Sequence, residues 1–251
     1  MNKFDRLSAL MRHFQMSVHL VEESEGNFIV YGDPQSGQPD GVEFWPQPER
    51  AESRIPAEKR LLEARADWGG QDNPMIAALP RRLNMGADST DNTGLLLQVV
   101  VTEAEARRCG SGSALNRLCE VLIISLLRRQ IERGAATPGL LAGLAHPQLS
   151  RAFVAMHDKP GKRWRNSELA EVAGMSLSRF SDQFVAQVGE APQSYLRRWR
   201  MVLARQQFAD GERVQSVARR LGYSSSEALT RAFNRHYGQS PVALRKESRA
   251  A

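Results

Sequence analysis

Two stretches, LAEVAGMSLSRFSDQFVAQVGEAPQSYL (169–196) and VARRLGYSSSEALTRAFNRHYGQSPVAL (217–244), decide the fold of the C-terminal part of this chain. They align as an internal repeat. Alanine, glycine and serine positions match at an offset of 48 residues, and the aromatic, glycine and proline positions after them match at an offset of 49. One extra residue in or just after the second turn explains the change. The sequence therefore predicts two copies of one supersecondary unit.

Each copy has the signals of a helix, a sharp turn and a second helix. The first helix ends at Gly174 or Gly222, because glycine adopts the left-handed conformation that such a turn needs. Ser176 in the first copy, and Ser224 or Ser225 in the second, can cap the following helix. This is the layout of a helix-turn-helix, whose second helix enters the major groove of DNA. Apolar residues four positions apart mark the buried face of each second helix: Phe180 and Phe184, and Leu229 and Phe233.

The segment between the copies, 192–209, is predicted to be one long helix that begins at Pro192. A helix of about 18 residues is roughly 27 Å long. It can hold two second helices about one DNA turn apart, roughly 34 Å, so that they enter successive major grooves on one side of the duplex.

The basic excess of the chain lies in the same region. Residues 146–251 contain 18 Lys and Arg against 9 Asp and Glu, whereas residues 1–145 contain 16 against 19. Clustered cations release condensed counterions when they meet phosphates, so this balance favours a polyanionic partner. The alternative is a merely solvated basic surface.

Residues 146–251 resemble the AraC/XylS family of bacterial transcription regulators. The resemblance rests on LAEVAGMSLSRFSDQF (169–184), YLRRWRMVLARQQF (195–208) and VQSVARRLGYSSSEALTRAFNRHYGQSP (214–241). It implies a seven-helix domain with an opening helix near 147–156, two helix-turn-helix motifs and a short closing helix after Pro241. It also implies a sequence-specific DNA-binding transcription regulator, expected to be an activator, with double-stranded DNA and RNA polymerase as partners. The alternative is a helical protein-interaction module without DNA binding.

The resemblance also assigns contacts with DNA. Carried over by position, it assigns base contacts in the first motif to Ser178, Ser181 and Asp182, and in the second to Ser226, Glu227, Thr230 and Arg231. Phosphate contacts fall to Ser176, Ser224, Arg198, Arg200 and Arg235.

Arg231 is the strongest single candidate, because arginine contacts guanine through two hydrogen bonds. Glu227 either accepts a hydrogen bond from cytosine or pairs with Arg231 four residues on. Asp182 is expected either to lower the DNA affinity of the first motif, because its carboxylate is repelled by nearby phosphates, or to contact a cytosine.

The N-terminal part resembles a subgroup of the same family with a cupin-type domain. The motifs are FDRLSALMRHF (4–14), FWPQP (44–48), DWGGQDNP (67–74), ALPRRLNM (78–85) and ALNRLCEVLIISLLRRQI (114–131). The implied organisation is a shortened sensor or dimerisation domain at 1–133, a linker at 134–145 and the DNA-binding domain at 146–251.

The residues of two segments in this part are compatible with two structural interpretations each. The stretch 94–101 has strand propensity but continues into a helix-like sequence, and the resemblance favours a helix over 93–108. The 114–131 helix forms either a homodimer interface or an intrachain core helix.

The fold class is therefore mainly α, with a smaller α+β domain in front. We expect a helix at 1–16 and strands at 18–21, 28–31, 42–45 and 61–66. The segment 17–70 has 54 residues, whereas a cupin barrel of eight strands needs about 80. A shortened sheet has open edges, which argues against an enclosed pocket and a small-molecule effector.

Other classes of function lack their signals. The sequence has no apolar run of 18 residues and no signal-peptide pattern, which indicates a cytoplasmic protein without a membrane span. Its five histidines lack metal-ligand spacing, and no catalytic motif is present, so neither an enzyme nor a metal or other cofactor is expected. Cys109, beside Arg107 and Arg108, is a candidate redox sensor, and Cys119 is a candidate core residue.

Overall fold

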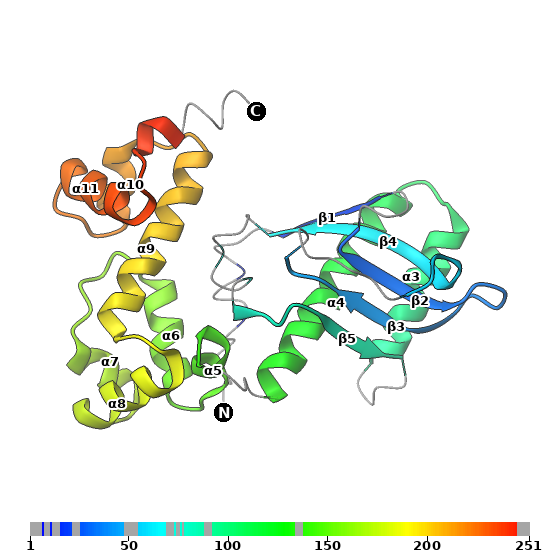
Figure 1. Ribbon diagram of the computed structural model, residues 1–251, viewed down its shortest axis with the longest axis horizontal. Coiled ribbons are helices and arrows are strands. Elements are labelled where there is room, and N and C mark those ends of the chain that lie inside the picture. Colours follow the sequence, from blue (N-terminus) through cyan, green and yellow to red (C-terminus); the bar gives the residue numbers. More distant parts are fainter. Residues whose placement is uncertain are drawn as a thin grey trace. The chain divides into compact units, whose positions relative to one another are not determined.

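A computed structural model describes residues 16–21, 26–47, 55–68, 73, 76, 78–87, 92–133 and 138–244, together with Leu7 and Met11. The chain divides into a β-rich unit within residues 14–133 and a mainly helical unit within residues 1–13 and 134–251, and each is described by itself (Figure 1). Leu7 and Met11 are helical, and Met16 is not. The rest of the helix expected at 1–16 lies outside the described residues.

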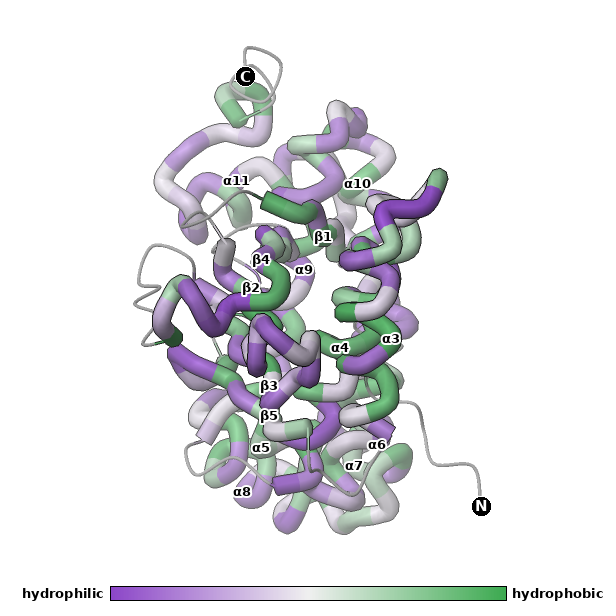
Figure 2. The backbone as a smooth tube through the Cα atoms, turned by 90° about the vertical axis from the view of Figure 1, so that its right-hand side faces the viewer, coloured by the Kyte–Doolittle hydropathy of each residue, from purple (hydrophilic) through white to green (hydrophobic). Residues whose placement is uncertain are grey.

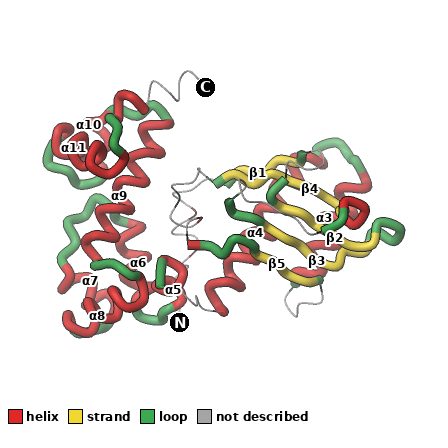
Figure 3. The backbone as a smooth tube through the Cα atoms, viewed as in Figure 1, coloured by secondary structure: helices red, strands yellow, loops and turns green. Residues whose placement is uncertain are grey.

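The β-rich unit contains one antiparallel sheet in the order β1-β4-β2-β3-β5 (Figure 3). The four expected strands are confirmed, most of them with extra residues at their ends. The fifth, β5, was not expected, because four residues carry too little alternation to predict a strand. Within the described part of the chain the sheet is open, with β1 and β5 at its edges. The bounds are β1 Ser17–Leu20, β2 Phe28–Asp33, β3 Gln38–Phe44, β4 Arg60–Asp67 and β5 Leu83–Gly86, with a short 3-10 helix η2 at Ala57–Lys59.

One face of the sheet is apolar because alternate residues of each strand point to it. Phe28 on β2 pairs with Phe44 on β3 and Ala64 on β4, while Val42 pairs with Met85 on β5, and all five are buried. Helices α3 (Thr93–Ala106) and α4 (Ser111–Arg133) pack on the sheet, and the hydrophobic stretches of α4 are green in Figure 2. The helix reading of 94–101 is therefore confirmed.

The helical unit follows the expected order of two helix-turn-helix motifs joined by one long helix (Figure 1). The structure differs from the expected linker at α5, whose Leu140, Leu141 and Leu144 are buried. Six residues are too short for a helical period to show in the sequence. The bounds are α5 Leu140–Ala145, α6 Leu149–Asp158, α7 Asn166–Ala173, α8 Leu177–Val188, α9 Pro192–Ala209, α10 Val214–Arg220 and α11 Ser226–Tyr237, and residues 241–244 are also helical.

Aromatic side chains from α6, α8 and α9 form the core of the first lobe. Phe153 stacks on Phe184 with ring centroids 5.1 Å apart and meets Tyr195 edge-on at 4.8 Å. The Tyr195 hydroxyl lies 2.6 Å from His157 Nε2, and burial raises the Tyr195 pKa above its ordinary range. This cluster fixes α8 against the long helix α9, and the opposite side of α8 faces the solvent.

Candidate nucleic-acid interface

The first helix-turn-helix is made of α7, a turn at Gly174 and α8. Gly174 has φ +67°, so it supplies the left-handed residue that ends α7. Ser176 caps α8, and its Oγ accepts the Arg179 backbone N–H at 3.4 Å. Phe180 and Phe184 are fully buried. The expected turn, cap and buried face are all confirmed.

The second motif repeats this construction with α10, a turn at Gly222 and α11. Gly222 has φ +75°. The Ser225 Oγ accepts a backbone N–H of the first turn at 3.2 Å, so Ser225 is the cap and Ser224 lies exposed before it. The buried face of α11 consists of Leu229 and Phe233, as expected.

The three candidate base contacts of α8 lie on its solvent side. Ser178 and Asp182 are exposed, and Ser178 Oγ donates to Asp182 Oδ2 at 3.5 Å. Ser181 is half-buried, and its hydroxyl donates to the Leu177 carbonyl at 2.9 Å. The candidate face of α8 therefore carries polar groups, its only carboxylate faces outward, and the apolar side chains of Leu177 and Val185 are exposed on the same helix. Arg179, which the sequence analysis did not single out, is an exposed cation on the same turn.

The four candidates of α11 also share one side of their helix. Glu227 and Arg231 are exposed, and Ser226 and Thr230 are half-buried. A hydrogen bond from the Ser225 side chain lowers the pKa of Glu227, and the charge of Arg231 adds a smaller effect in the same direction. Glu227 is therefore an anion at neutral pH, beside the arginine expected to contact a base.

Two of the phosphate candidates are engaged inside the protein. Arg198 donates from Nε and Nη2 to Glu190 Oε1, at 2.9 and 2.5 Å. Arg200 donates from Nε to the Pro160 carbonyl at 2.6 Å and from Nη2 to the Lys162 carbonyl at 2.8 Å, and its burial lowers its pKa. Both guanidinium groups have structural partners before any phosphate arrives. The other candidates, Ser176, Ser224 and Arg235, are exposed.

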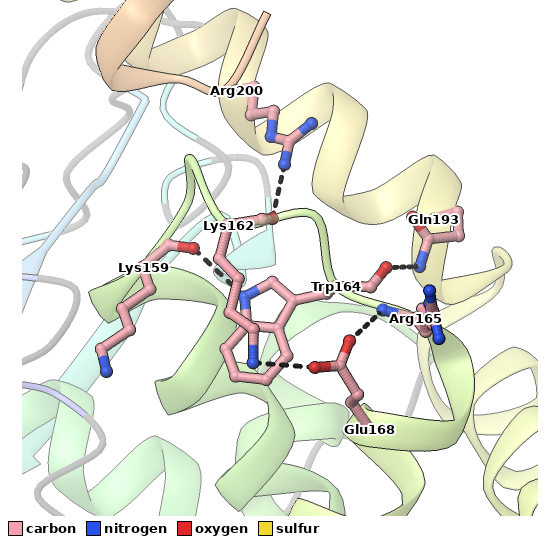
Figure 4. Close-up of polar contacts among 7 residues, drawn as sticks. All are labelled: Lys159, Lys162, Trp164, Arg165, Glu168, Gln193 and Arg200. Atoms are coloured by element: carbon pink, nitrogen blue, oxygen red, sulfur yellow. Dashed lines mark hydrogen bonds and ion pairs between the residues drawn. The ribbon is translucent and has the colours of Figure 1, made fainter.

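The loop 159–165 between α6 and α7 is held against α9 (Figure 4). Trp164 is 9% exposed, and its indole Nε1 donates to the Lys159 carbonyl at 3.1 Å. Gln193 on α9 donates to the Trp164 carbonyl at 2.9 Å, and Lys162 Nζ lies 3.7 Å from the centroid of the Trp164 ring. These contacts, with those of Arg200, give the loop a fixed course.

The same loop presents cations that the sequence analysis missed. Lys159, Lys162, Arg163 and Arg165 are exposed. Lys162 also pairs with Glu168 at 3.0 Å. The available signal was the run KPGKRWR (159–165), with four basic residues in seven.

The described residues show no sign of two other kinds of site. None of their helices is long and apolar enough to cross a membrane. No group of three His, Cys, Asp or Glu side chains among them is placed to hold a metal ion.

Two family models match the chain, a helix-turn-helix domain over residues 169–247 and a cupin over residues 16–132. A putative AraC-like transcription regulator from Streptomyces lividans is 33% identical over 68% of this chain and 58% of its own length. The HTH-type transcriptional regulator AlkR from Acinetobacter baylyi is 32% identical over 70% of this chain and 59% of its own. The chain thus spans less than three fifths of either relative.

Among solved structures, the DNA-binding domain of AdpA in complex with a target DNA is 31% identical. The match covers 41% of this chain and 94% of that chain, with a TM-score of 0.37. The order of the two matched family models agrees with the β-rich unit followed by two helix-turn-helix motifs. The chain belongs to the AraC family of helix-turn-helix transcription regulators and has an N-terminal cupin domain.

Proposed function

We propose that this protein regulates transcription by binding double-stranded DNA sequence-specifically, with α8 and α11 in two successive major grooves. The observation that carries the proposal is the pair of capped helices at the two ends of α9, each with its aromatic side buried and its polar candidate residues on the solvent side. An 18-residue helix such as α9 is roughly 27 Å long, which suits a separation of about one DNA turn.

The two helices are expected to contribute unequally. Arg231 and Thr230 on α11 offer donors to base edges, with Ser226 and Glu227 beside them. On α8 the candidates Ser178 and Ser181 share their surface with Asp182, which phosphates repel. Base discrimination therefore comes mainly from the second motif.

The phosphate contacts are proposed to differ in strength as well. Exposed Ser224 lies just before α11, exposed Arg235 lies in its last turn, and Ser176 is the cap of α8. Arg198 and Arg200 are the weaker candidates, because Glu190 and the carbonyls of the 159–165 loop already accept their hydrogen bonds.

The test is binding of the full chain to a DNA site selected from a random library, measured by fluorescence anisotropy. We expect Arg231→Ala to weaken binding to the selected site by about 1–3 kcal/mol and to leave binding to a scrambled duplex nearly unchanged. Arg151→Ala, which removes an exposed arginine from α6, is the control. An equal loss of affinity for both duplexes would show that Arg231 does not contact a base. Failure to retain any DNA at moderate salt would favour the protein-interaction module.

The direction of regulation is proposed to be activation, with RNA polymerase as the partner protein. Transcription in vitro from a promoter that contains the selected site tests this. A rise in transcript on adding the protein supports activation, and a fall shows repression.

Dimerisation through the 114–131 segment of α4 is a separate proposal. The apolar face of that helix is already buried inside the β-rich unit, which favours the intrachain alternative. Val121 is 46% exposed and is the apolar residue on which a partner helix would pack. A monomer by analytical ultracentrifugation at micromolar concentration would exclude the dimer.

A further inference from the structure

A pocket lies between the last two turns of α4 and the edge strand β5, which run beside each other in the β-rich unit (Figure 1). Its volume is 140 Å³. Buried Leu83 and Leu126 contribute its apolar lining. The polar lining consists of Arg82, Asn84, Arg129, Gln130 and Arg133.

The periodicity of α4 explains why its polar groups converge there. Residues three, four and seven positions apart share one face of a helix. Leu126, Arg129, Gln130 and Arg133 have this spacing, so one apolar and three polar side chains line the same side of the pocket. The opposite side comes from the start of β5 and the residue before it. Because β5 is an edge strand, no further strand of the described sheet closes this side.

The pocket is strongly cationic. Among the described residues, three guanidinium groups line it and no carboxylate does. Arg82 has a nearby anion outside the lining, Glu43, with Arg82 Nη1 3.6 Å from Glu43 Oε1. The two groups form an ion pair, and the Arg82 side chain is 43% exposed, so solvent screens their attraction.

Arg129 provides the decisive observation. Its Nη1 atom is buried and has no hydrogen-bond partner among the described residues. A guanidinium donor that is removed from water without an acceptor costs free energy. Arg129 lies near the C-terminal end of α4, where the helix dipole favours a cation. The dipole, however, supplies no hydrogen-bond acceptor to Nη1. Arg129 therefore lines the pocket and carries a buried donor without an acceptor among the described residues.

We propose that this pocket binds a compact oxyanion ligand, a small molecule whose carboxylate or phosphate group is held by Arg129, Arg133 and Arg82. Arginine suits this chemistry because its planar fork donates two parallel hydrogen bonds to such a group. Asn84 and Gln130 add amide groups that hydrogen-bond the remaining polar atoms of the ligand. The volume of 140 Å³ is close to that of a cavity that accepts benzene, about 150 Å³, so the ligand has roughly the size of a six-membered ring. This site is independent of the proposed binding of DNA.

The experiment is titration calorimetry of the full chain with inorganic phosphate and, separately, with malonate, against sodium chloride at equal ionic strength. We expect saturable binding of one equivalent of at least one oxyanion and none of chloride. Saturation by phosphate alone identifies a phosphate ligand, and saturation by malonate alone identifies a carboxylate ligand. Linear heats with both anions would overturn the proposal.

Variants locate the site. Arg129→Gln is expected to lower the affinity for the anion about tenfold or more, because it removes a charge-assisted pair of hydrogen bonds. Arg128→Gln is the matched control, since Arg128 is the exposed neighbour on α4 and does not line the pocket. Arg133→Gln gives a second test at an exposed position in case Arg129→Gln fails to fold. An equal loss with Arg128→Gln would show general charge attraction and refute a built site.

Discussion

The backbone of Gly161 lies directly against that of Gly222. A Cβ atom on Gly222 would fall 2.0 Å from the Gly161 carbonyl oxygen, and one on Gly161 would fall 2.1 Å from the carbonyl oxygen of Arg220. Gly161 belongs to the loop that Arg200 binds, and Gly222 is the turn of the second helix-turn-helix. The loop that precedes the first motif therefore touches the turn of the second, so α9 is not the only connection between the two lobes.

Replacing Gly161 by alanine should disturb this connection. The added methyl group has no room beside a backbone carbonyl, so the loop must move. We expect the free energy of unfolding to fall by about 1–3 kcal/mol, the usual cost of overpacking. Affinity should fall more for a duplex with both half-sites than for one with a single half-site, because the spacing of α8 and α11 changes. Urea unfolding and anisotropy on the two duplexes measure these effects.

Gly112→Ala is the control for that variant. A Cβ on Gly112 meets nothing within 4 Å, and the residue lies in the first turn of α4. Alanine there should raise stability by up to about 1 kcal/mol, because it favours a helix over glycine. If Gly161→Ala behaved like Gly112→Ala, the contact with Gly222 would have no role in placing the lobes.

Arg200 offers a test between a structural role and a phosphate contact. Arg200→Gln removes two charge-assisted hydrogen bonds to the Pro160 and Lys162 carbonyls, so we expect it to lower the free energy of unfolding by about 1.5–3 kcal/mol. Arg197→Gln, at an exposed position of the same helix, should change stability little. The opposite pattern, unchanged stability with a smaller salt dependence of DNA binding, would identify Arg200 as a phosphate ligand.

Local rules explain why the helix-turn-helix motifs could be predicted from the sequence. The turn at Gly174, the cap at Ser176 and the buried Phe180 each depend on residues within one or two helical turns. The solvent side of each second helix follows from the same spacing, and the candidate residues lie on that side, some exposed and some half-buried.

The features that sequence analysis missed depend on contacts between distant residues. Arg200 binds a carbonyl 40 residues away, and this partner leaves no periodic pattern in the sequence. The strand β5 has four residues and is defined by its pairing with β3, from Phe44↔Leu83 to Gly41↔Gly86. The helix α5 is six residues long. In each case tertiary packing, and not local propensity, determines the structure.

The two cysteines should differ sharply in reactivity. Cys109 is exposed, whereas Cys119 is buried in α4, and burial raises the pKa of its thiol to about 12. Only the thiolate reacts with an alkylating reagent, and it must also be reached by that reagent. Iodoacetamide at mildly alkaline pH should therefore modify Cys109 alone, as shown by peptide mass spectrometry. Both should react after unfolding in urea, and modification of Cys119 in the folded protein would contradict its burial.

His146 should make the stability of the helical unit depend on pH. Its Nδ1 accepts the backbone N–H groups of Gln148 and Leu149, each at 3.2 Å, so the ring must be neutral at that atom. Burial, and to a smaller extent the charge of Arg179, lowers the pKa of His146 below its ordinary 6.5. A lowered pKa favours the neutral ring in the folded state. The resulting stability is complete above 6.5 and is lost as the pH falls through the folded-state pKa.

We therefore expect the melting temperature to fall between about pH 7.5 and about pH 5.5, and His146→Asn to reduce that fall. Asparagine keeps an acceptor for the two N–H groups but does not titrate in this range. Burial lowers the pKa of His236 as well, so part of the fall should remain in the variant, and His236→Asn is the matched comparison. An identical fall in the wild type and in His146→Asn would show that protonation of His146 does not break these two hydrogen bonds, because no stability would then be linked to its titration.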